Sequence, residues 1–140
     1  MATKKTTKQT QKDSGAKSQS KLTKKKLTKA VLHVEATFNN TKVVVTDTAG
    51  NSLFWSSAGS LGFKGAKKGT PFAATKVGEV LSEKAEAIGI KEIDVVIRGV
   101  GSGREPAMRA FVARGFELGT IKDETPVPHN GPRAKKPRRV

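Results

Sequence analysis

The chain of 140 residues contains no cysteine and only two histidines, His33 and His129. Without cysteine it has no disulfide framework and no thiolate ligand for a metal ion. Two histidines far apart in the sequence do not provide the ligands of an ordinary zinc site. We therefore expect no metal and no cofactor, and the lack of disulfides is typical of a protein of the reduced cytoplasm.

Long apolar runs are also missing from the sequence. No segment approaches the roughly 20 apolar residues that a membrane span needs, and the N-terminus has no hydrophobic stretch of the signal-peptide type. Residues 1–29 contain no arginine, whereas transit peptides for organelles are typically rich in it. We expect neither a membrane protein nor a secreted protein.

Positive charge is concentrated at the two ends of the chain, whose net charge is +15. Residues 1–29 hold ten lysines and one acidic residue, and residues 126–140 hold five lysines or arginines and no acidic residue. Residues 30–125 are nearly neutral, with twelve basic and eleven acidic residues. A basic arm that lies along nucleic acid releases counterions from the phosphates, which favours binding. We therefore predict a nucleic acid as the main partner and no small-molecule substrate.

The same division of charge predicts the domain organisation. Lysine, threonine, glutamine and serine dominate residues 1–29, and this composition is too polar to build a core. We expect a basic N-terminal extension there that is disordered in the free protein. Residues 30–125 have the length of one small globular α/β domain that binds RNA. Residues 126–140 form a basic C-terminal tail.

Apolar alternation and turn signals predict three strands near the start of the domain. The first covers residues 31–38 and ends in a tight turn at Asn39 and Asn40. The second covers residues 41–47 and the third covers residues 53–55. The alternating residues expected on the core face of the first strand are Leu32, Val34, Ala36 and Phe38.

A basic loop punctuated by glycines, residues 56–70, leads into the second half of the domain. A helix is predicted to begin at Thr70 and Pro71, because threonine caps a helix and proline fits its first turn. Gly89 is predicted to end this helix, since glycine adopts the left-handed conformation that commonly follows a helix.

A strand, a helix and a last strand complete the domain. The strand is predicted at residues 90–98, the helix just past Gly103 and the last strand at residues 116–122. The inner side of this second helix is expected to carry Ala107, Met108, Phe111 and Val112. Because helical crossovers return parallel strands, we predict a single-domain α/β fold, with a mixed five-stranded sheet and two main helices packed on it.

The sharpest local pattern is a glycine-rich stretch between the predicted fourth strand and second helix. Glycines allow a backbone to approach an anion closely, the start of a helix offers unpaired N–H donors, and arginine makes bidentate contacts to phosphate. The residues that would form such a phosphate cradle are Arg98, Gly99, Gly101, Gly103 and Arg104. The alternative, that the glycines only make a tight turn from strand to helix, is equally compatible with the sequence.

No enzyme motif is complete in this sequence. A dinucleotide fingerprint requires glycine where Arg104 stands, and residues 65–70 have the order of a Walker loop reversed. A two-metal nuclease needs several convergent carboxylates. The candidates on predicted strands, Glu35, Asp47 and Asp94, are better explained as solvated surface or turn residues. We expect a protein that is not an enzyme.

The aromatic and histidine residues carry weaker signals. Phe54 and Trp55, at the end of a β run, are expected to fill the core. Phe63, alone among glycines and lysines, could stack on a base or a partner protein, or fold back onto the core. His33 is predicted to be a surface residue on the polar side of the first strand.

The C-terminal tail combines prolines with cations. Prolines keep a chain extended, so the basic residues of the tail can follow a groove of nucleic acid, and we expect a partner to order the tail. Asn130 and Gly131 predict a turn. Because glycine leaves the following amide unshielded, Asn130 is also a candidate for conversion to isoaspartate.

Six short motifs, spread from residue 33 to residue 131, are informative as a set. They are HV at 33–34, TFNNT at 37–41, WSSAG at 55–59, GTPFAA at 69–74, GVGSGREPAMR at 99–109 and TPVPHNG at 125–131. With them, residues 30–140 resemble the bacterial-type small-subunit ribosomal protein eleven family. The resemblance implies a ribonuclease-H-like core without nuclease activity, on the platform of the small ribosomal subunit. It also implies that the protein bridges several rRNA helices, contacts neighbouring platform proteins, and helps form the cleft for the Shine–Dalgarno duplex of messenger RNA.

The sequence departs from the family pattern at two places. Pro132 stands where family tails commonly have cysteine, and the extension of residues 1–29 is longer and more basic than expected, so its contacts are not transferred from the family. From charge, glycine content and resemblance together, the residues expected to contact RNA are Asn39, Asn40, Lys64, Lys67, Lys68, Arg98, Gly99, Gly101, Gly103, Arg104, Arg109, His129, Asn130, Gly131, Arg133, Lys135, Lys136, Arg138 and Arg139.

One alternative function shares the charge distribution, namely a basic protein that compacts DNA. Such a protein would bind duplex DNA as tightly as folded rRNA, so competition between the two ligands at fixed salt separates the two functions. The favoured prediction is a structural RNA-binding protein of the ribosome. Its specificity would come from RNA shape and from the arrangement of several RNA helices more than from base edges.

Overall fold

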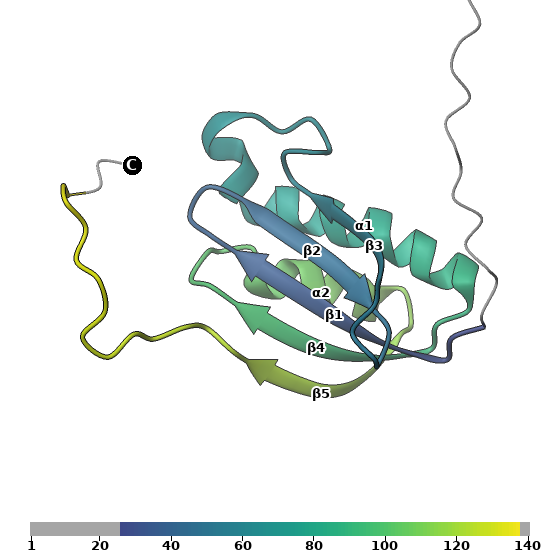
Figure 1. Ribbon diagram of the computed structural model, residues 1–140. Helices are drawn as coiled ribbons and strands as arrows, with labels where there is room; N and C mark the ends of the chain where they lie inside the picture. The colour runs from purple at the N-terminus through teal and green to yellow at the C-terminus, as the bar shows by residue number, and fades with distance from the viewer. Residues whose placement is uncertain (1–25, 138–140) are drawn as a thin grey trace, which may run out of the picture.

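The structure, a computed structural model, describes residues 26–137. Five strands form one sheet in the order β3-β2-β1-β4-β5 (Figure 1). The strands are β1 (Lys29–Ala36), β2 (Thr41–Thr46), β3 (Ser52–Ser57), β4 (Glu92–Arg98) and β5 (Glu117–Asp123). β2 is antiparallel to β1 and β3, whereas β4 is parallel to β1 and β5. This arrangement is ribonuclease-H-like and confirms the predicted mixed five-stranded sheet.

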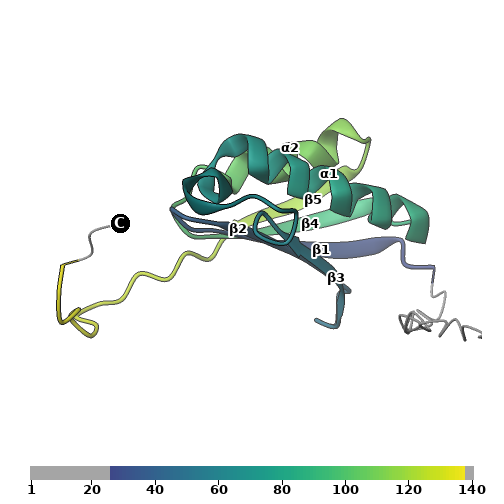
Figure 2. The same ribbon diagram turned by 90° about the horizontal axis from the view of Figure 1, so that it is seen from above.

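Two helices, α1 (Pro71–Ile88) and α2 (Arg104–Ala113), pack on one face of the sheet (Figure 2). A short 3-10 helix, η1 (Gly65–Gly69), precedes α1. As predicted, Thr70 caps α1, accepting a hydrogen bond from Ala73 N at 3.4 Å, and Gly89 ends it with a φ of 91°. None of the helices within residues 26–137 is both long and apolar enough to span a membrane.

The core lies between the two helices and the covered face of the sheet. Its largest fully buried apolar side chains are Leu32, Val34, Val43, Val45, Val77, Leu81, Ile93, Val95 and Phe111. Gly78 lets the helices approach closely, because an added Cβ would lie 2.6 Å from Ala107 O and 2.7 Å from Ala110 Cβ. Removing this apolar surface from water is the main term that stabilises the domain.

Two aromatic residues predicted to face the core are exposed. β1 ends at Ala36, and a turn follows in which Thr37 N donates to Asn40 O at 2.8 Å. The alternation therefore stops before Phe38, which is 67% exposed. Trp55 pairs with Val44 on the uncovered face of the sheet and is 58% exposed. The prediction that Phe38 and Trp55 face the core is wrong.

The other core predictions hold with one exception. Phe54 is half-buried and packs against the core, as predicted. On α2, Ala107 and Phe111 are buried, but Val112 is exposed and Ala110 takes an inner position. Residues 107, 110 and 111 follow the helical spacing of a narrow buried stripe, and residue 112 lies past its edge.

Candidate nucleic-acid interface

Four connections meet at one edge of the sheet. Four of the five strands run in the same direction. β2 is antiparallel to both β1 and β3, and β4 is parallel to both β1 and β5. The carboxyl ends of β1, β3, β4 and β5 therefore lie together at this edge. The connections are the turn at residues 37–40, the loop at 58–70, the loop at 99–103 and the tail from residue 124 (Figure 1). We term this region the loop edge. α1 and α2 also begin there, so most of the predicted RNA contacts gather at the loop edge.

The glycines of the 99–103 loop pack against the protein's own backbone. A Cβ added at Gly99 would overlap the carbonyl oxygen of Ala36, and one added at Gly101 would overlap that of Thr37. Gly101 N also donates to Ala36 O at 2.9 Å. Gly99 has a φ of 97°, which L side chains rarely adopt. Both glycines therefore allow the loop to lie directly on the end of β1.

Neighbouring glycines serve the same purpose between other connections. A Cβ at Gly103 would overlap Thr41 Oγ1, and one at Gly69 would overlap Phe38 O. The hydroxyl of Ser102 donates to Gly69 O at 2.8 Å and joins the two loops. The tight-turn alternative thus accounts for the glycines of the 99–103 loop without an anion, and the side chains around them are the groups left to bind a ligand.

Arg104 is bound to the end of the neighbouring strand. Its guanidinium forms an ion pair with Asp123, which also accepts hydrogen bonds from the hydroxyl of Thr125 at 2.6 Å and its backbone N at 3.0 Å. The bonds from Thr125, followed by that from Arg104, lower the pKa of Asp123 to about 2. Thr125 Oγ1 in turn accepts from Gly99 N at 3.2 Å. This network holds the start of the tail against the glycine loop.

An open hollow lies beside the start of α2. Its volume is about 570 Å³, and it is lined by Ile97, Gly101, Ser102, Arg104, Glu105, Pro106 and Arg109. Arg109 Nη2 lies 2.9 Å from Glu105 Oε2 one turn earlier, and both side chains are exposed. An open site with both signs of charge suits contact with an extended chain better than enclosure of a small molecule.

The loop at residues 58–70 presents lysines without acidic partners. Lys64 precedes η1, and Lys67 and Lys68 lie in its last turn. Lys64 and Lys67 are exposed, and Lys68 is half-buried. Within residues 26–137, none of the three forms an ion pair with a carboxylate. Their ammonium groups are therefore available to neutralise phosphates.

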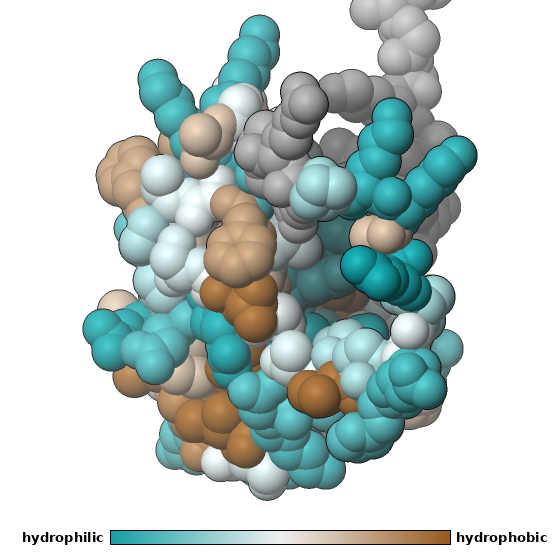
Figure 3. Space-filling view, turned by 90° about the vertical axis from the view of Figure 1, so that its left-hand side faces the viewer, coloured by the Kyte–Doolittle hydropathy of each residue, from teal (hydrophilic) through white to brown (hydrophobic). Residues whose placement is uncertain are grey.

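Aromatic side chains lie among these cations. Phe63 is half-buried against the core and meets Phe72 edge to face, with ring centroids 6.1 Å apart, which favours the fold-back alternative for Phe63. Phe72 is 63% exposed, and Lys76 Nζ lies 5.6 Å from its ring centroid. Figure 3 shows the loop edge with brown apolar atoms between teal hydrophilic side chains. Neither Phe72 nor the exposed Phe38 was among the predicted contact residues, although Phe72 follows the basic loop and Phe38 precedes the asparagine turn.

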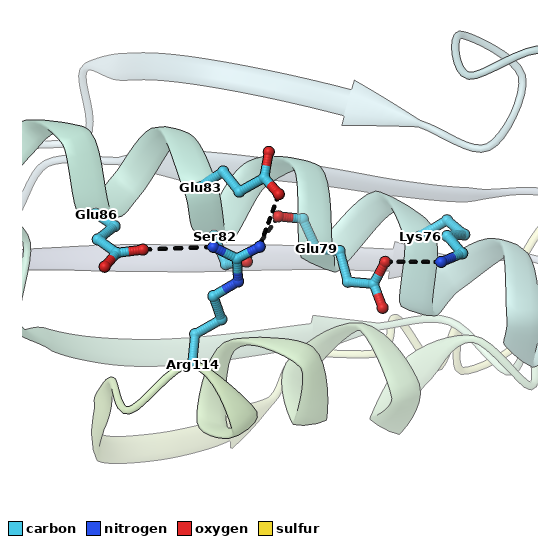
Figure 4. A network of polar contacts seen from close by, with 6 residues as sticks. All are labelled: Lys76, Glu79, Ser82, Glu83, Glu86 and Arg114. Carbon is cyan, nitrogen blue, oxygen red and sulfur yellow. Dashed lines mark hydrogen bonds and ion pairs between the residues drawn. The ribbon is translucent and has the colours of Figure 1, made fainter.

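The charged side chains on the outer side of the helix layer pair with one another. Arg114, after α2, pairs with Glu83 at 2.7 Å and Glu86 at 3.4 Å, and Lys76 pairs with Glu79 at 2.9 Å (Figure 4). The paired charges of this surface largely cancel, whereas the unpaired lysines of the loop edge attract phosphate. The charges of the described residues thus favour one direction of approach for a nucleic acid.

A model of the family described as Ribosomal protein S11 matches residues 30–139, which include the whole loop edge. The chain belongs to this family. It is therefore an RNA-binding protein of the small ribosomal subunit that serves translation, associated with rRNA and other ribosomal proteins. Family members are structural components of the ribosome, which is in general a cytoplasmic particle. The resemblance found in the sequence is confirmed.

The S11 family match continues through the tail. Residues 126–137 extend away from the sheet (Figure 1), and Asn130 has a φ of 57°, which fits a turn at this position. The predicted contact residues of the tail that are exposed are His129, Asn130, Gly131, Arg133, Lys135 and Lys136. Arg138 and Arg139 lie outside the described residues, as does most of the N-terminal extension.

The remaining predicted contacts lie around the turn after β1. Asn39 and Asn40 are half-buried in this turn, where Asn40 N donates to Thr37 Oγ1 at 3.1 Å. Arg98, the last residue of β4, is exposed and in register with Glu35 of β1 on the uncovered face. Arg98 therefore points away from the start of α2 and from Arg104, and the two arginines do not converge on one site.

The carboxylates considered for a nuclease do not converge either. Glu35 and Asp94 each pair with a lysine of the sheet. Asp47 follows β2 at the opposite edge and accepts hydrogen bonds from Asn51, which lower the pKa of Asp47. Residues 26–137 contain no group of three or more His, Cys, Asp or Glu side chains suited to a metal ion.

Proposed function

We propose that the loop edge and the tail are the rRNA-binding surface of this small-subunit ribosomal protein. The observation that carries the proposal is the convergence of lysines without acidic partners, exposed aromatic rings and the base of a cationic tail at one edge of a nearly neutral domain. Because these cations lie on two separate connections, the 58–70 loop and the tail, more than one RNA segment can be neutralised at once.

In this proposal the protein sits on the platform of the subunit and bridges several rRNA helices. The tail gives the reach that bridging requires, since fifteen extended residues span at most about 50 Å. We also propose that the protein lies near messenger RNA and helps form the cleft for the Shine–Dalgarno duplex. Family membership is the support for this placement.

The proposed role is structural and involves no catalysis. The domain of residues 30–125 fixes the geometry, and residues 1–29 and 126–140 act as basic arms that become ordered on RNA. In the folded part, β1 begins at Lys29 and β5 ends at Asp123, which is compatible with these boundaries.

Deletion of residues 126–140 tests the proposal through the salt dependence of rRNA affinity. The slope of log affinity against log salt should fall by roughly 0.7 to 0.9 for each phosphate contact that is lost. Thermal unfolding of the same variant should match the full chain, because the tail adds little to the core. An unchanged slope would show that the tail touches no phosphate.

Competition between folded rRNA and duplex DNA separates this function from DNA compaction. At fixed salt, we expect rRNA to displace the protein from DNA and DNA not to displace it from rRNA. Equal competition by both nucleic acids would favour the compacting protein.

Asn130 is proposed as a modification site on the same tail. Its side chain is exposed and glycine follows it, which is the sequence context that favours cyclisation to isoaspartate. A peptide map of aged, assembled particles should show a mass increase of about one dalton in the peptide that contains Asn130, because the side-chain amide is lost as ammonia and water is added. Unmodified asparagine throughout such material would remove the proposal.

A further inference from the structure

The face of the sheet opposite the helices carries a row of one histidine and three apolar side chains that no element within residues 26–137 covers (Figure 2). In register across the strands, the row consists of Trp55, Val44, His33 and Val96. Trp55 is 58% exposed, and the three others are half-buried between their strand neighbours. We term this surface, with the adjoining Val31, the open face.

Five charged side chains of the open face pair with one another, whereas Arg98 and Lys122, next to the loop edge, form no ion pair within residues 26–137. Lys29 Nζ lies 3.0 Å from Glu92 and 3.2 Å from Asp94, and Lys42 Nζ lies 3.7 Å from Glu35. The lysines of the loop edge, by contrast, have no carboxylate partner in the described part of the chain. Away from Arg98 and Lys122 the electrostatic field over the open face is therefore weak, and a phosphate backbone would release few counterions there.

We propose that the open face is a docking surface for another protein of the small subunit, one that presents an apolar patch with few charges. This inference rests on the proposed function, which leaves rRNA at the loop edge. A tryptophan beside β-branched aliphatic side chains, with paired charges around them, has the composition of the centre of a protein interface. The exposed ring of Trp55, continued across the sheet by half-buried valines, would lose its remaining apolar surface to water-free contact if such a partner docked.

The geometry allows both partners to bind at once. The loop edge lies at the carboxyl ends of the strands, whereas the open face lies on the flat side of the same strands (Figure 1, Figure 2). The two surfaces adjoin along the carboxyl ends of β1, β3, β4 and β5, where the open face carries Glu35, Arg98 and Lys122. The sheet would thus hold RNA along one edge and a protein across one face.

Single cysteines provide the test, because the natural chain has none. Val44→Cys reports on the open face, Ala134→Cys on the tail and Lys84→Cys on the exposed outer side of α1. The rate of maleimide labelling is measured for the full chain alone, with naked small-subunit rRNA, and with this rRNA plus the remaining small-subunit proteins. Each rate is compared with the rate of the same variant alone.

We expect the maleimide labelling of Val44→Cys to be slowed at least about tenfold, and only when the other small-subunit proteins are present. Slowing by rRNA alone would assign the open face to RNA, for example to a base stacked on Trp55, and would overturn the inference. Slowing in the protein alone that increases with its concentration would indicate a second copy of the chain and would also overturn it. Unchanged labelling in all three mixtures would show a free surface.

Ala134→Cys separates this inference from the proposed function. The tail probe should already be slowed by naked rRNA, and its failure to respond would contradict RNA binding by the tail, whatever Val44→Cys shows. Lys84→Cys gives the labelling rate expected for an exposed helix surface away from both sites.

Trp55→Ala provides a second measurement that does not depend on thiol reactivity. The side chain is exposed, so the variant should keep the circular dichroism spectrum and naked-rRNA affinity of the wild type. In competition with wild-type protein during assembly with all other small-subunit proteins, it should be incorporated several-fold less well. Equal incorporation, or a loss of affinity for naked rRNA, would contradict docking of a protein at Trp55.

Discussion

Replacing Gly101 by alanine separates the two explanations of the glycine loop. An added Cβ would overlap Thr37 O and lie 2.8 Å from Thr37 C and 2.9 Å from Ala36 C. These atoms are backbone, so the loop itself must move, which also strains the 2.9 Å hydrogen bond from Gly101 N to Ala36 O. Overpacking and one weakened hydrogen bond together cost about 2–4 kcal/mol of unfolding free energy.

Gly59→Ala is the matched control. A Cβ at Gly59 would have Lys68 Cδ at 3.6 Å as its nearest neighbour, which is ordinary contact, and Gly59 is not among the glycines with positive φ. This alanine should leave the stability within about 0.5 kcal/mol, or raise it slightly by restricting the unfolded chain.

The assay is thermal and urea unfolding of the full chain, followed by circular dichroism and by the fluorescence of the single tryptophan. For a domain of this size we expect Gly101→Ala to lower Tm by about 10 °C or more, and Gly59→Ala to leave it nearly unchanged. The rRNA affinity of both folded variants is measured well below their Tm. If Gly101→Ala unfolded like the control but lost its rRNA affinity, Gly101 would serve the approach of an anion, and the packing explanation would be refuted.

Two further predictions concern the same edge. Asp123 has a pKa of about 2 in the folded protein against an ordinary 3.8, so it stabilises the fold above pH 3.8 and loses this effect as the pH falls toward 2. The check is urea unfolding at a series of pH values. The difference in unfolding free energy between wild type and Asp123→Asn should be constant near neutral pH and should become smaller between pH 3.8 and pH 2. A difference that stays constant at every pH would contradict the network with Thr125. Phe72→Ala, which removes an exposed ring, should weaken rRNA binding by about 1–3 kcal/mol if a base stacks there. Its Tm should fall slightly below that of Val112→Ala, an exposed apolar control on α2, because the edge-to-face contact with Phe63 is lost. Unchanged rRNA affinity would exclude stacking at Phe72.

Much of the fold could be predicted because local signals agreed with the long-range ones. Thr70, Pro71 and Gly89 marked both ends of α1, and the strand-helix-strand order required parallel pairing for β4 and β5. Alternation along β1 also identified its buried side chains correctly up to Ala36.

The errors arose where a residue's surroundings depend on distant parts of the chain. Alternation shows that Trp55 and Phe54 face opposite sides of β3, but only the position of the helices decides which side is covered. Similarly, no local signal shows that Gly101 lies on Thr37, which is far away in the sequence. Glycines that admit an anion and glycines that admit another backbone segment have the same local pattern.

The salt dependence of rRNA binding by two double variants tests the central claim most directly. Lys64→Ala/Lys67→Ala removes two cations of the loop edge, and Lys84→Ala/Lys91→Ala removes two exposed cations from the outer side of α1 and the opposite edge of the sheet. Both pairs change the net charge equally. We predict that the first pair lowers the slope of log affinity against log salt by roughly 1.4 to 1.8 and that the second leaves it unchanged. If both double variants lowered this slope equally, RNA binding would depend on net charge alone and not on the loop edge.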